Sequence, residues 1–551
     1  MMHRLKIAGL FLLILWLLGF GIHWAGLAGV FSDSVGGIRA QDETTYASSA
    51  ANLAVHGGWM TPKVLGRFYL VKPPLLIWLS GFSMRILGIS RLALRLPILL
   101  AATFATLFLF IWSEARYGRW TAVIATLLIV ANPLWHTFSR ICYTDMLLAL
   151  AMIGALWAVD RDPSLSERRN IFLFGVFLAL GLMAKNVAGL LPLAVLSVAC
   201  LLTRRRLPVV SILKSCAVTA VIAAPWHLYQ LITHPRWFWA DYVQIQLLEF
   251  GLRPPVQPSP DGAVWFYLKR LLLTDPLLSL LALIALPFLV RAVRAGKHDA
   301  GLLLSWLLVT GLALLSFRYR NLPYLLYSVP PLALAAAAYA VPVLGNRHKL
   351  AALLLAAVFC VKVTFPSQVW GLSFGANAPV SSAPWLRWYA DQRRPNELIA
   401  VNSDDEFYAA ALPIPKIHYC YLDPNALVRR YAPHYAYLGI TVSAAEFQEI
   451  DRLQPQFLER LRRWGLPSAA PIATNIVAPS PADIERLVET HPHIDFYLPR
   501  DIVNQIPPEV TSTRRVVPLS ADRSFLLAMD GPEGGPETRV AQVRWSVPKD
   551  W

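Results

Sequence analysis

Two carboxylates and a lysine stand out in the first long polar stretch of a very hydrophobic chain. The stretch reads DETTYASSAANLAVHGGWMTPKVLGRFYLVKPPLLIWLSG; it begins with Asp42 and Glu43, and Lys72 precedes two prolines near its end. A carboxylate at a membrane surface can act as a general base or a metal ligand. A lysine held by a stiff Pro-Pro segment can bind a phosphate as a point charge. Taken alone, each motif also fits an ordinary role: helix capping for the acidic pair and snorkelling for the lysine.

Later polar stretches add one carboxylate and several cations. In SRICYTDMLLAL, Asp145 lies at the start of an apolar run, where it serves a site, caps its own helix or pairs with Arg140. Lys185 lies in a short break between two apolar runs. The remaining candidate cations are Arg253, Arg318 and Arg320. The aromatic residues around Arg253 are also typical of an interfacial belt.

The composition of the whole chain indicates a protein that crosses a membrane many times. Of its 551 residues, 56% are hydrophobic and only 15% are charged, whereas soluble domains contain about 25% charged residues. A helix that crosses a bilayer needs about 20 apolar residues, and hydropathy predicts eleven spans, the first of them retained because it is too long for a signal peptide. They lie near residues 7–31, 92–112, 120–136, 144–159, 171–184, 187–203, 208–228, 268–290, 301–317, 322–343 and 349–365.

Basic residues predict which side of the membrane each loop faces. The positive-inside rule explains the net charge of +16 better than nucleic-acid binding does, because Lys and Arg gather in alternate loops between the apolar runs. With eleven spans, these loops and the N-terminus all lie on the cytoplasmic side. The outer side then receives the stretches that contain Asp42, Lys72, Asp145, Lys185 and Arg320. We therefore expect these side chains to converge at one membrane surface.

Such a convergence suits the transfer of a sugar from a lipid phosphate. The phosphate must be neutralised as it leaves, and the acceptor hydroxyl must lose its proton. Cations and a separate carboxylate supply these two functions. Five cysteines are present, but they form no CxxC pair or other metal-ligand spacing, so we expect neither a zinc site nor a disulfide framework.

The last third of the chain is less hydrophobic and predicts a second domain. We expect residues 1–365 to form the transmembrane domain and residues 366–551 to form a soluble α/β domain on the outer side. NELIAVN (396–402) and RSFLLAMD (523–530) are predicted strands, and residues 445–464 and 481–491 are predicted amphipathic helices.

The order of motifs in roughly the first 345 residues resembles the polyprenyl-phosphate-sugar-dependent glycosyltransferases. These include the bacterial aminoarabinose transferases that modify lipid A and, more distantly, the protein O-mannosyltransferases. The first loop contains D-E-x-x-Y-A, G-x-W-x-x-P and Y-x-x-K-P-P-L, and R-L-P follows at Arg95. The later motifs are R-x-x-x-x-D, from Arg140 to Asp145, and S-x-R-Y-R-N-L-P-Y-x-L, from Ser316 to Leu326.

The resemblance implies a GT-C fold, an all-α polytopic membrane bundle whose first outer loop, residues 32–91, carries juxtamembrane helices. It implies that Asp42, with Glu43 beside it, provides the catalytic base, that Lys72 binds the donor phosphate and that Asp145 supports the site. The other predicted phosphate-binding residues are Arg253, Arg318, Arg320 and Lys185. The predicted substrate-pocket residues are Tyr46, Tyr69, Arg140 and Tyr324.

The same resemblance implies the partners of the protein. The donor is a polyprenyl-phosphate-linked sugar, the acceptor is a lipid such as lipid A, a glycan or a protein, and one displacement inverts the anomeric centre. The outer segments contain no N-x-[ST] site, which favours a bacterial inner membrane over the endoplasmic reticulum. Where aminoarabinose transferases have a glutamate before the K-P-P lysine, this chain has Val71, and their histidine-containing segment before the phosphate-binding arginine is here LEFGLR (248–253). We therefore predict no metal ligands, although a divalent metal stays a cofactor to test.

Two other functions use the same cations and topology. A transporter or flippase of a lipid-linked or anionic solute would have broken helices around a midplane site and an inverted repeat. The sequence has one break, near Lys185, and no repeat. The second alternative is a non-catalytic receptor whose C-terminal domain binds a partner.

Overall fold

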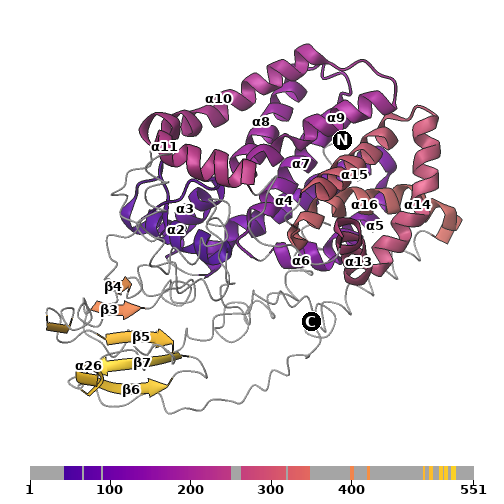
Figure 1. Cartoon of the computed structure of the whole chain (residues 1–551). Helices are drawn as coiled ribbons and strands as arrows, with labels where there is room; N and C mark the ends of the chain where they lie inside the picture. Colours follow the sequence, from indigo (N-terminus) through magenta and orange to yellow (C-terminus); the bar gives the residue numbers. More distant parts are fainter. Residues whose placement is uncertain are drawn as a thin grey trace.

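The computed structural model describes residues 42–347, except 65–66, 89–90, 140, 250–261 and 318–319, and short segments between 398 and 528. Most of the described chain is helical, as predicted for a membrane bundle (Figure 1). The predicted helices at 7–31, 349–365 and 445–464, and most of the one at 481–491, lie outside the described residues. Arg140, Arg253 and Arg318 lie outside them as well.

Six helical segments of the described chain are long and apolar enough to cross a membrane, and each overlaps a predicted span. These segments are Leu92–Tyr117, Arg168–Leu202, Val209–Thr233, Pro276–Arg294, His298–Ser316 and Leu322–Val343. They correspond to α4 (Arg91–Tyr117), α8 (Arg168–Lys185) with α9 (Leu191–Leu202), α10 (Val209–Thr233), α14 (Pro276–Arg294), α15 (His298–Ser316), and η3 (Leu322–Ser328) with α16 (Val329–Ala335) and η4 (Ala336–Ala340). Figure 1 labels the α-helices among them. α10 is the least buried of the six, with 22% of its apolar window inside the described protein.

Two predicted spans are interrupted in the structure, each at a proline. The span at 120–136 divides into α5 (Arg119–Val130) and α6 (Pro133–Phe138), and the one at 268–290 divides into α13 (Ala263–Thr274) and α14. Asn132 Oδ1 accepts hydrogen bonds from the first amides of α6, and Asp275 Oδ1 accepts one from Leu278 N in α14. The two capping side chains also contact each other, because Asn132 Nδ2 donates to Asp275 Oδ2 at 3.0 Å. Side-chain capping therefore stabilises both breaks.

α7 (Thr144–Arg161) is the central helix, and nearly all of its side chains are buried. It packs on α4, α8 and η3. Asp145 lies in its first turn and Asp160 lies near its other end, so the helix joins two charged clusters at opposite ends of the bundle. We call the end that contains Asp145 the site end.

The far end of the bundle holds an ion-pair network. Arg116, at the end of α4, lies 3.2 Å from Asp299 in α15 and 3.8 Å from Asp160 in α7. Trp112 Nε1 donates to Asp160, and Tyr339 Oη donates to Asp299. Three of the loops predicted to be cytoplasmic adjoin these residues, and the side of the membrane on which they lie stays a prediction.

The chain reverses sharply at Lys185, where α8 ends. Asn186 has a φ of +56°, and a 3₁₀ turn (η1, Asn186–Leu190) leads into α9. Gly181 and Gly189 touch across the reversal: a Cβ on Gly189 would lie 2.0 Å from Leu182 N. Beyond this contact the two helices separate, since α8 packs on α7 and α10 whereas α9 packs on α15. The break that hydropathy predicts near Lys185 is confirmed.

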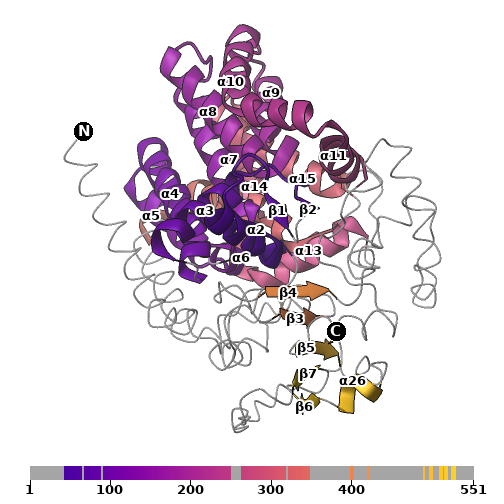
Figure 2. The same ribbon diagram turned by 90° about the vertical axis from the view of Figure 1, so that its left-hand side faces the viewer.

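The first loop folds against the site end. α2 (Asp42–His56) is followed by a short antiparallel hairpin, β1 (Lys63–Val64) and β2 (Arg67–Phe68), and by α3 (Leu75–Leu87), which packs on α2 (Figure 2). Gly57 and Gly58 end α2 with positive φ angles. Trp226 Nε1 of α10 donates to the carbonyl of Met60 at 2.9 Å and joins the loop to the bundle. The predicted loop of residues 32–91 thus contains the helices α2 and α3, and their position at a membrane surface stays a prediction.

The described part of the C-terminal region forms a five-stranded mixed sheet with the order β4-β3-β5-β7-β6. The strands are β3 (Leu398–Val401), β4 (His418–Tyr421), β5 (Asp495–Pro499), β6 (Arg514–Pro518) and β7 (Arg523–Ala528). β3 pairs in parallel with β4 and β5, and β7 pairs antiparallel with β5 and β6. β3 and β7 confirm the two strands predicted from the sequence.

Candidate active site

Asp145, Lys185 and Tyr327 form a hydrogen-bonded cluster at the site end. They come from the first turn of α7, the last residue of α8 and η3. The Lys185 ammonium lies 2.5 Å from Asp145 Oδ1 and donates to Tyr327 Oη at 2.8 Å, and Tyr327 Oη donates to the same carboxylate oxygen. The side chains of Lys185 and Asp145 are only 12% and 4% exposed. Asp145 is therefore paired with a cation from a distant part of the sequence.

Tyr324 covers one side of this cluster. The Lys185 ammonium lies 4.7 Å from the centroid of the Tyr324 ring, a cation–π distance. An ammonium has three donors, and the contacts with Asp145 and Tyr327 use two of them. The third can reach a ligand, so the predicted phosphate-binding role of Lys185 fits the geometry and stays a prediction.

Lys72 and Asp42 lie beside the cluster. Lys72 precedes α3, and its pKa is lowered mainly by burial and also by Lys185, whereas Asp42 and Asp145 raise it. Contributions of this kind come from charges nearby in space. Asp42 occupies the exposed side of α2 in the helix's first turn. Four charged residues from separate segments therefore lie close enough to influence one another.

Three tyrosines line the space between these charges. The Tyr46 ring lies edge-on to the rings of Tyr69 and Tyr143, with centroids 6.3 and 6.4 Å apart. Burial, followed by Tyr69, Asp42 and Asp145, raises the pKa of Tyr46 well above the value of a free phenol. The Tyr46 hydroxyl thus stays neutral and keeps its proton as a hydrogen-bond donor. Tyr46 and Tyr69, two of the predicted pocket residues, are in contact, and their role in a substrate pocket stays a prediction.

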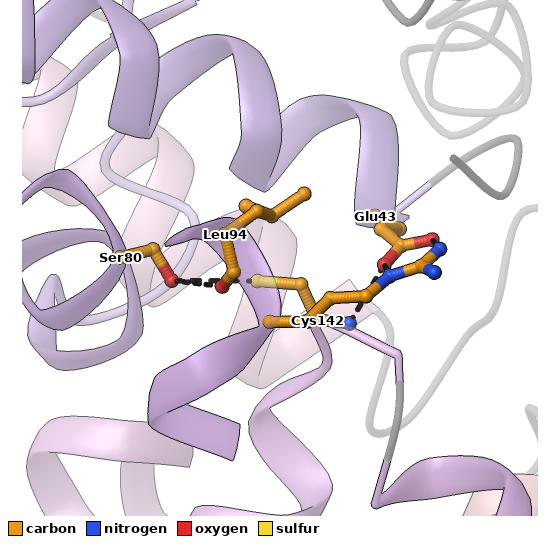
Figure 3. Close-up of polar contacts among 5 residues, drawn as sticks. Glu43, Ser80, Leu94 and Cys142 are labelled. Carbon is orange, nitrogen blue, oxygen red and sulfur yellow. Dashed lines mark hydrogen bonds and ion pairs between the residues drawn. The ribbon is translucent and has the colours of Figure 1, made fainter. Parts of the chain in front are cut away.

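Glu43 does not share the environment of Asp42, although the two are neighbours. Successive helical residues point about 100° apart, and Glu43 is fully buried whereas Asp42 is exposed. The Glu43 carboxylate is held by the Arg95 guanidinium, with Nε to Oε1 at 2.7 Å and Nη2 to Oε2 at 2.8 Å (Figure 3). These are the contacts of a residue that fixes structure, and the catalytic role predicted for it is untested.

Sequence reasoning did not assign two members of the site. Tyr327 belongs to the same motif as Tyr324, but the motif does not show which tyrosine reaches Asp145. Arg95 was noted only as part of R-L-P. The signal that was available is an arginine inside an apolar helix, which needs a buried partner. Among the remaining predicted residues, Arg320 is half-buried close to η3.

Comparison with solved structures identifies the architecture. ArnT from Cupriavidus metallidurans bound to undecaprenyl phosphate aligns over 95% of this chain and 98% of its own, with a TM-score of 0.65 and 16% sequence identity. The apo structure of the same protein gives a TM-score of 0.62 over 92% of this chain. The chain has the ArnT fold.

Two sequence comparisons agree with the ArnT fold. The family model "Dolichyl-phosphate-mannose-protein mannosyltransferase" matches residues 71–229. Undecaprenyl phosphate-alpha-4-amino-4-deoxy-L-arabinose arabinosyl transferases from Pectobacterium carotovorum and Aeromonas salmonicida are 27% and 26% identical over 322 residues. The chain spans about half the length of these curated relatives, 54% and 56% of each. The resemblance to polyprenyl-phosphate-sugar glycosyltransferases that the motifs indicate is confirmed.

The candidate site contains side chains of both charges. Within the described ranges, no group of three or more His, Cys, Asp or Glu side chains could hold a metal ion. The site instead gathers two carboxylates, two ammonium groups and several phenols, of which Asp145 and Lys185 neutralise each other. Metal dependence is therefore a property to test by chelation.

The Asp145–Lys185 pair of the candidate site should show strong energetic coupling. Breaking a buried pair by removing one partner costs about 3–5 kcal/mol, because the other charge stays buried. We expect Asp145→Asn and Lys185→Met each to lower the free energy of unfolding by roughly this amount, and the double variant to lose clearly less than the sum. Denaturant unfolding in detergent measures the cycle. Strictly additive losses would contradict the pairing.

The titration of Lys72 should make the free energy of unfolding depend on pH in the alkaline range. Its folded pKa lies below the ordinary 10.5, so between the two values the unfolded chain binds more protons than the folded one. The free energy of unfolding then rises with pH in that window. Lys72→Met should flatten the rise, whereas Lys214→Met, at an exposed position on α10, should not. Unfolding curves at a series of pH values test this, and an unchanged slope in Lys72→Met would refute it.

Proposed function

We propose that this chain is a membrane glycosyltransferase that moves a sugar from a polyprenyl-phosphate donor to an acceptor hydroxyl. The observation that carries the proposal is the convergence of Asp42, Lys72 and the Asp145–Lys185–Tyr327 cluster at one end of an ArnT-type bundle. An exposed carboxylate beside a half-buried cation supplies a base and an anion-binding group within one site.

The mechanism follows from the separate environments of these residues. The acceptor oxygen forms a bond to C1 of the sugar while the bond from C1 to the phosphate oxygen breaks. Asp42 takes the proton of the acceptor hydroxyl, and the departing phosphate keeps the electron pair of the broken bond, stabilised by Lys72. A single displacement inverts C1. Asp145 holds Lys185 in place next to the leaving group.

The donor and acceptor are proposed from the relatives. The curated relatives are named for undecaprenyl phosphate carrying 4-amino-4-deoxy-L-arabinose, so an undecaprenyl-phosphate-linked sugar is the proposed donor class. The acceptor is a lipid of the lipid A type, a glycan or a protein. Val71, in the position before Lys72, adds no charge to the site, and a donor sugar without an amino group therefore belongs in any substrate panel.

The location proposed for the chain is a bacterial inner membrane. Six apolar helical segments and the ArnT-type fold support a multi-pass protein. We propose eleven spans, a cytoplasmic N-terminus and two domains, 1–365 in the membrane and 366–551 as an α/β domain on the periplasmic side. The five-stranded sheet supports the second domain.

The rival function is a transporter or flippase, because the helical segment Arg168–Leu202 is interrupted after Lys185 and interrupted helices are typical of transporter sites. The decisive experiment supplies the purified chain in nanodiscs with isotope-labelled undecaprenyl-phosphate sugars and candidate acceptors. We expect mass spectrometry to show free undecaprenyl phosphate and an acceptor heavier by one sugar. Intact donor after incubation with the whole panel, together with donor movement between leaflets in proteoliposomes, would establish transport instead.

A further inference from the structure

The buried carboxylate of Glu43 joins three segments of the chain at one point. Oε1 accepts hydrogen bonds from Arg95 Nε at 2.7 Å and from the backbone amide of Cys142 at 2.9 Å, and Oε2 accepts one from Arg95 Nη2 at 2.8 Å. The fork-to-fork geometry of a guanidinium and a carboxylate fixes orientation as well as distance. Glu43 belongs to α2, Arg95 to α4, and Cys142 to the segment before α7. We call these three residues the Glu43 clamp.

A second contact supports the Glu43 clamp from α3. Ser80 Oγ donates to the carbonyl of Leu94 at 2.9 Å and lies 3.6 Å from Cys142 Sγ (Figure 3). Ser80, Leu94 and Cys142 are fully buried. Burial in surroundings of low polarity strengthens such hydrogen bonds and makes an unpaired member costly. Both helices of the first loop are therefore attached to α4 and to the start of α7.

The Glu43 clamp adjoins two residues of the candidate site along the chain. Asp42 is the neighbour of Glu43 on α2, and Asp145 follows Cys142 by three positions in the first turn of α7. Asp42 is exposed, whereas Asp145 and the three clamp residues are buried. A shift of Glu43 relative to Cys142 would thus change the gap between Asp42 and the Asp145–Lys185 pair.

We propose that Glu43 and Arg95 are positioning residues that set the separation between Asp42 and the Asp145–Lys185 pair, an inference that rests on the proposed transfer reaction. Glu43 does not exchange protons with the substrate, because three donors already occupy its carboxylate. Its contribution is geometric, and a misplacement of about 1 Å can cost roughly 10²-fold in rate. Donor binding through Lys72 does not depend on it.

The primary test measures kcat and donor affinity separately. Glu43→Gln keeps the shape of the side chain but sets an amide NH₂ against the Arg95 guanidinium. We expect kcat to fall about 10²-fold, with the Kd for undecaprenyl phosphate within roughly twofold of the parent. Arg95→Lys keeps the positive charge but cannot form the paired hydrogen bonds of a guanidinium, and we expect its kcat to fall less than that of Arg95→Met. A folded Glu43→Gln variant with parental kcat would overturn the proposal.

Two further variants separate positioning from stability. Glu43→Gln combined with Arg95→Gln leaves no buried charge unpaired, so we expect unfolding stability to recover while kcat stays low. Arg116→Gln is the matched control on the same helix, since it breaks the ion pairs at the far end of α4 and should lower stability with kcat unchanged. Recovery of kcat together with stability in the double variant would overturn a positioning role.

Hydrogen exchange distinguishes failure of this inference from failure of the proposed function. The amide of Cys142 donates to Glu43, so peptides that contain residues 141–145 should exchange faster in Glu43→Gln than in the parent, whatever the chain catalyses. Faster exchange with parental transfer rates would refute positioning and leave the transferase proposal standing. A parent chain that transfers no sugar would refute the function, and the positioning role would fall with it.

Discussion

Replacing Asp42 by asparagine will lower the rate of sugar transfer by about 10²–10⁴-fold with the fold intact. This is the contribution of a general base that accepts a proton in the transition state, and asparagine cannot accept one. Asp42 lies on the exposed side of α2, and it has no ion-pair partner within the part of the chain that the structure describes. A substitution at such a position changes stability by only about 0.5 kcal/mol.

Initial rates of undecaprenyl phosphate release, measured at saturating donor and acceptor, test the loss of the base. The thermal unfolding midpoint in detergent shows whether the fold is kept, and Asp42→Glu, which keeps a carboxylate on a longer side chain, is the matched control. We expect Asp42→Glu to retain more activity than Asp42→Asn. Transfer by Asp42→Asn near the parental rate would remove Asp42 from the mechanism.

Replacing Lys72 by methionine will mainly weaken binding of the donor phosphate. A hydrogen bond to a charged group contributes about 1.5–3 kcal/mol, so we expect the Kd for undecaprenyl phosphate to rise roughly 10–150-fold. Methionine matches the length and the apolar stem of lysine, so packing before α3 changes little. Burial lowers the pKa of Lys72, which shows that keeping the ammonium charged in the folded protein is costly. Methionine removes this cost, so the free energy of unfolding of the variant should be no lower than that of the parent.

Binding measured in nanodiscs by titration with undecaprenyl phosphate tests the role of Lys72. Lys72→Arg, which keeps the charge, should bind more tightly than Lys72→Met. A neutral polyprenol of the same length is the ligand control, because its affinity should be equal for all three proteins. An unchanged phosphate affinity in Lys72→Met would rule out the assigned contact.

The site was predictable from the sequence to the extent that membrane topology fixes position. Asp42, Lys72, Asp145 and Lys185 are charged residues at the ends of apolar runs, and the alternation of loops puts them on one side. The partners were not predictable, because Asp145 and Tyr327 are 182 positions apart and a periodic pattern contains no information about which helices touch. The neighbours Asp42 and Glu43 were inseparable for the same reason, since only the location of Arg95 decides which one faces inward.

The fold was predictable where hydropathy alone decides and less so where capping decides. Long apolar helices occur where spans were predicted, including the pair that meets at Lys185. The spans at 120–136 and 268–290 were drawn through prolines, and the structure divides both. At these breaks Asn132 caps the start of α6 and Asp275 caps the start of α14. A hydropathy value averaged over a window of residues does not detect such caps.

The contact between Gly181 and Gly189 limits how this protein can diversify. The reversal that presents Lys185 has no space for even a methyl group at Gly189, so random substitution there disrupts the backbone before it can alter selectivity. In the proposed transferase, changes in substrate preference would arise from side chains around the ammonium, such as Tyr324, rather than from a change in the path of the chain. Engineering should therefore keep the turn at residues 185–189 unchanged and vary the side chains that surround Lys185.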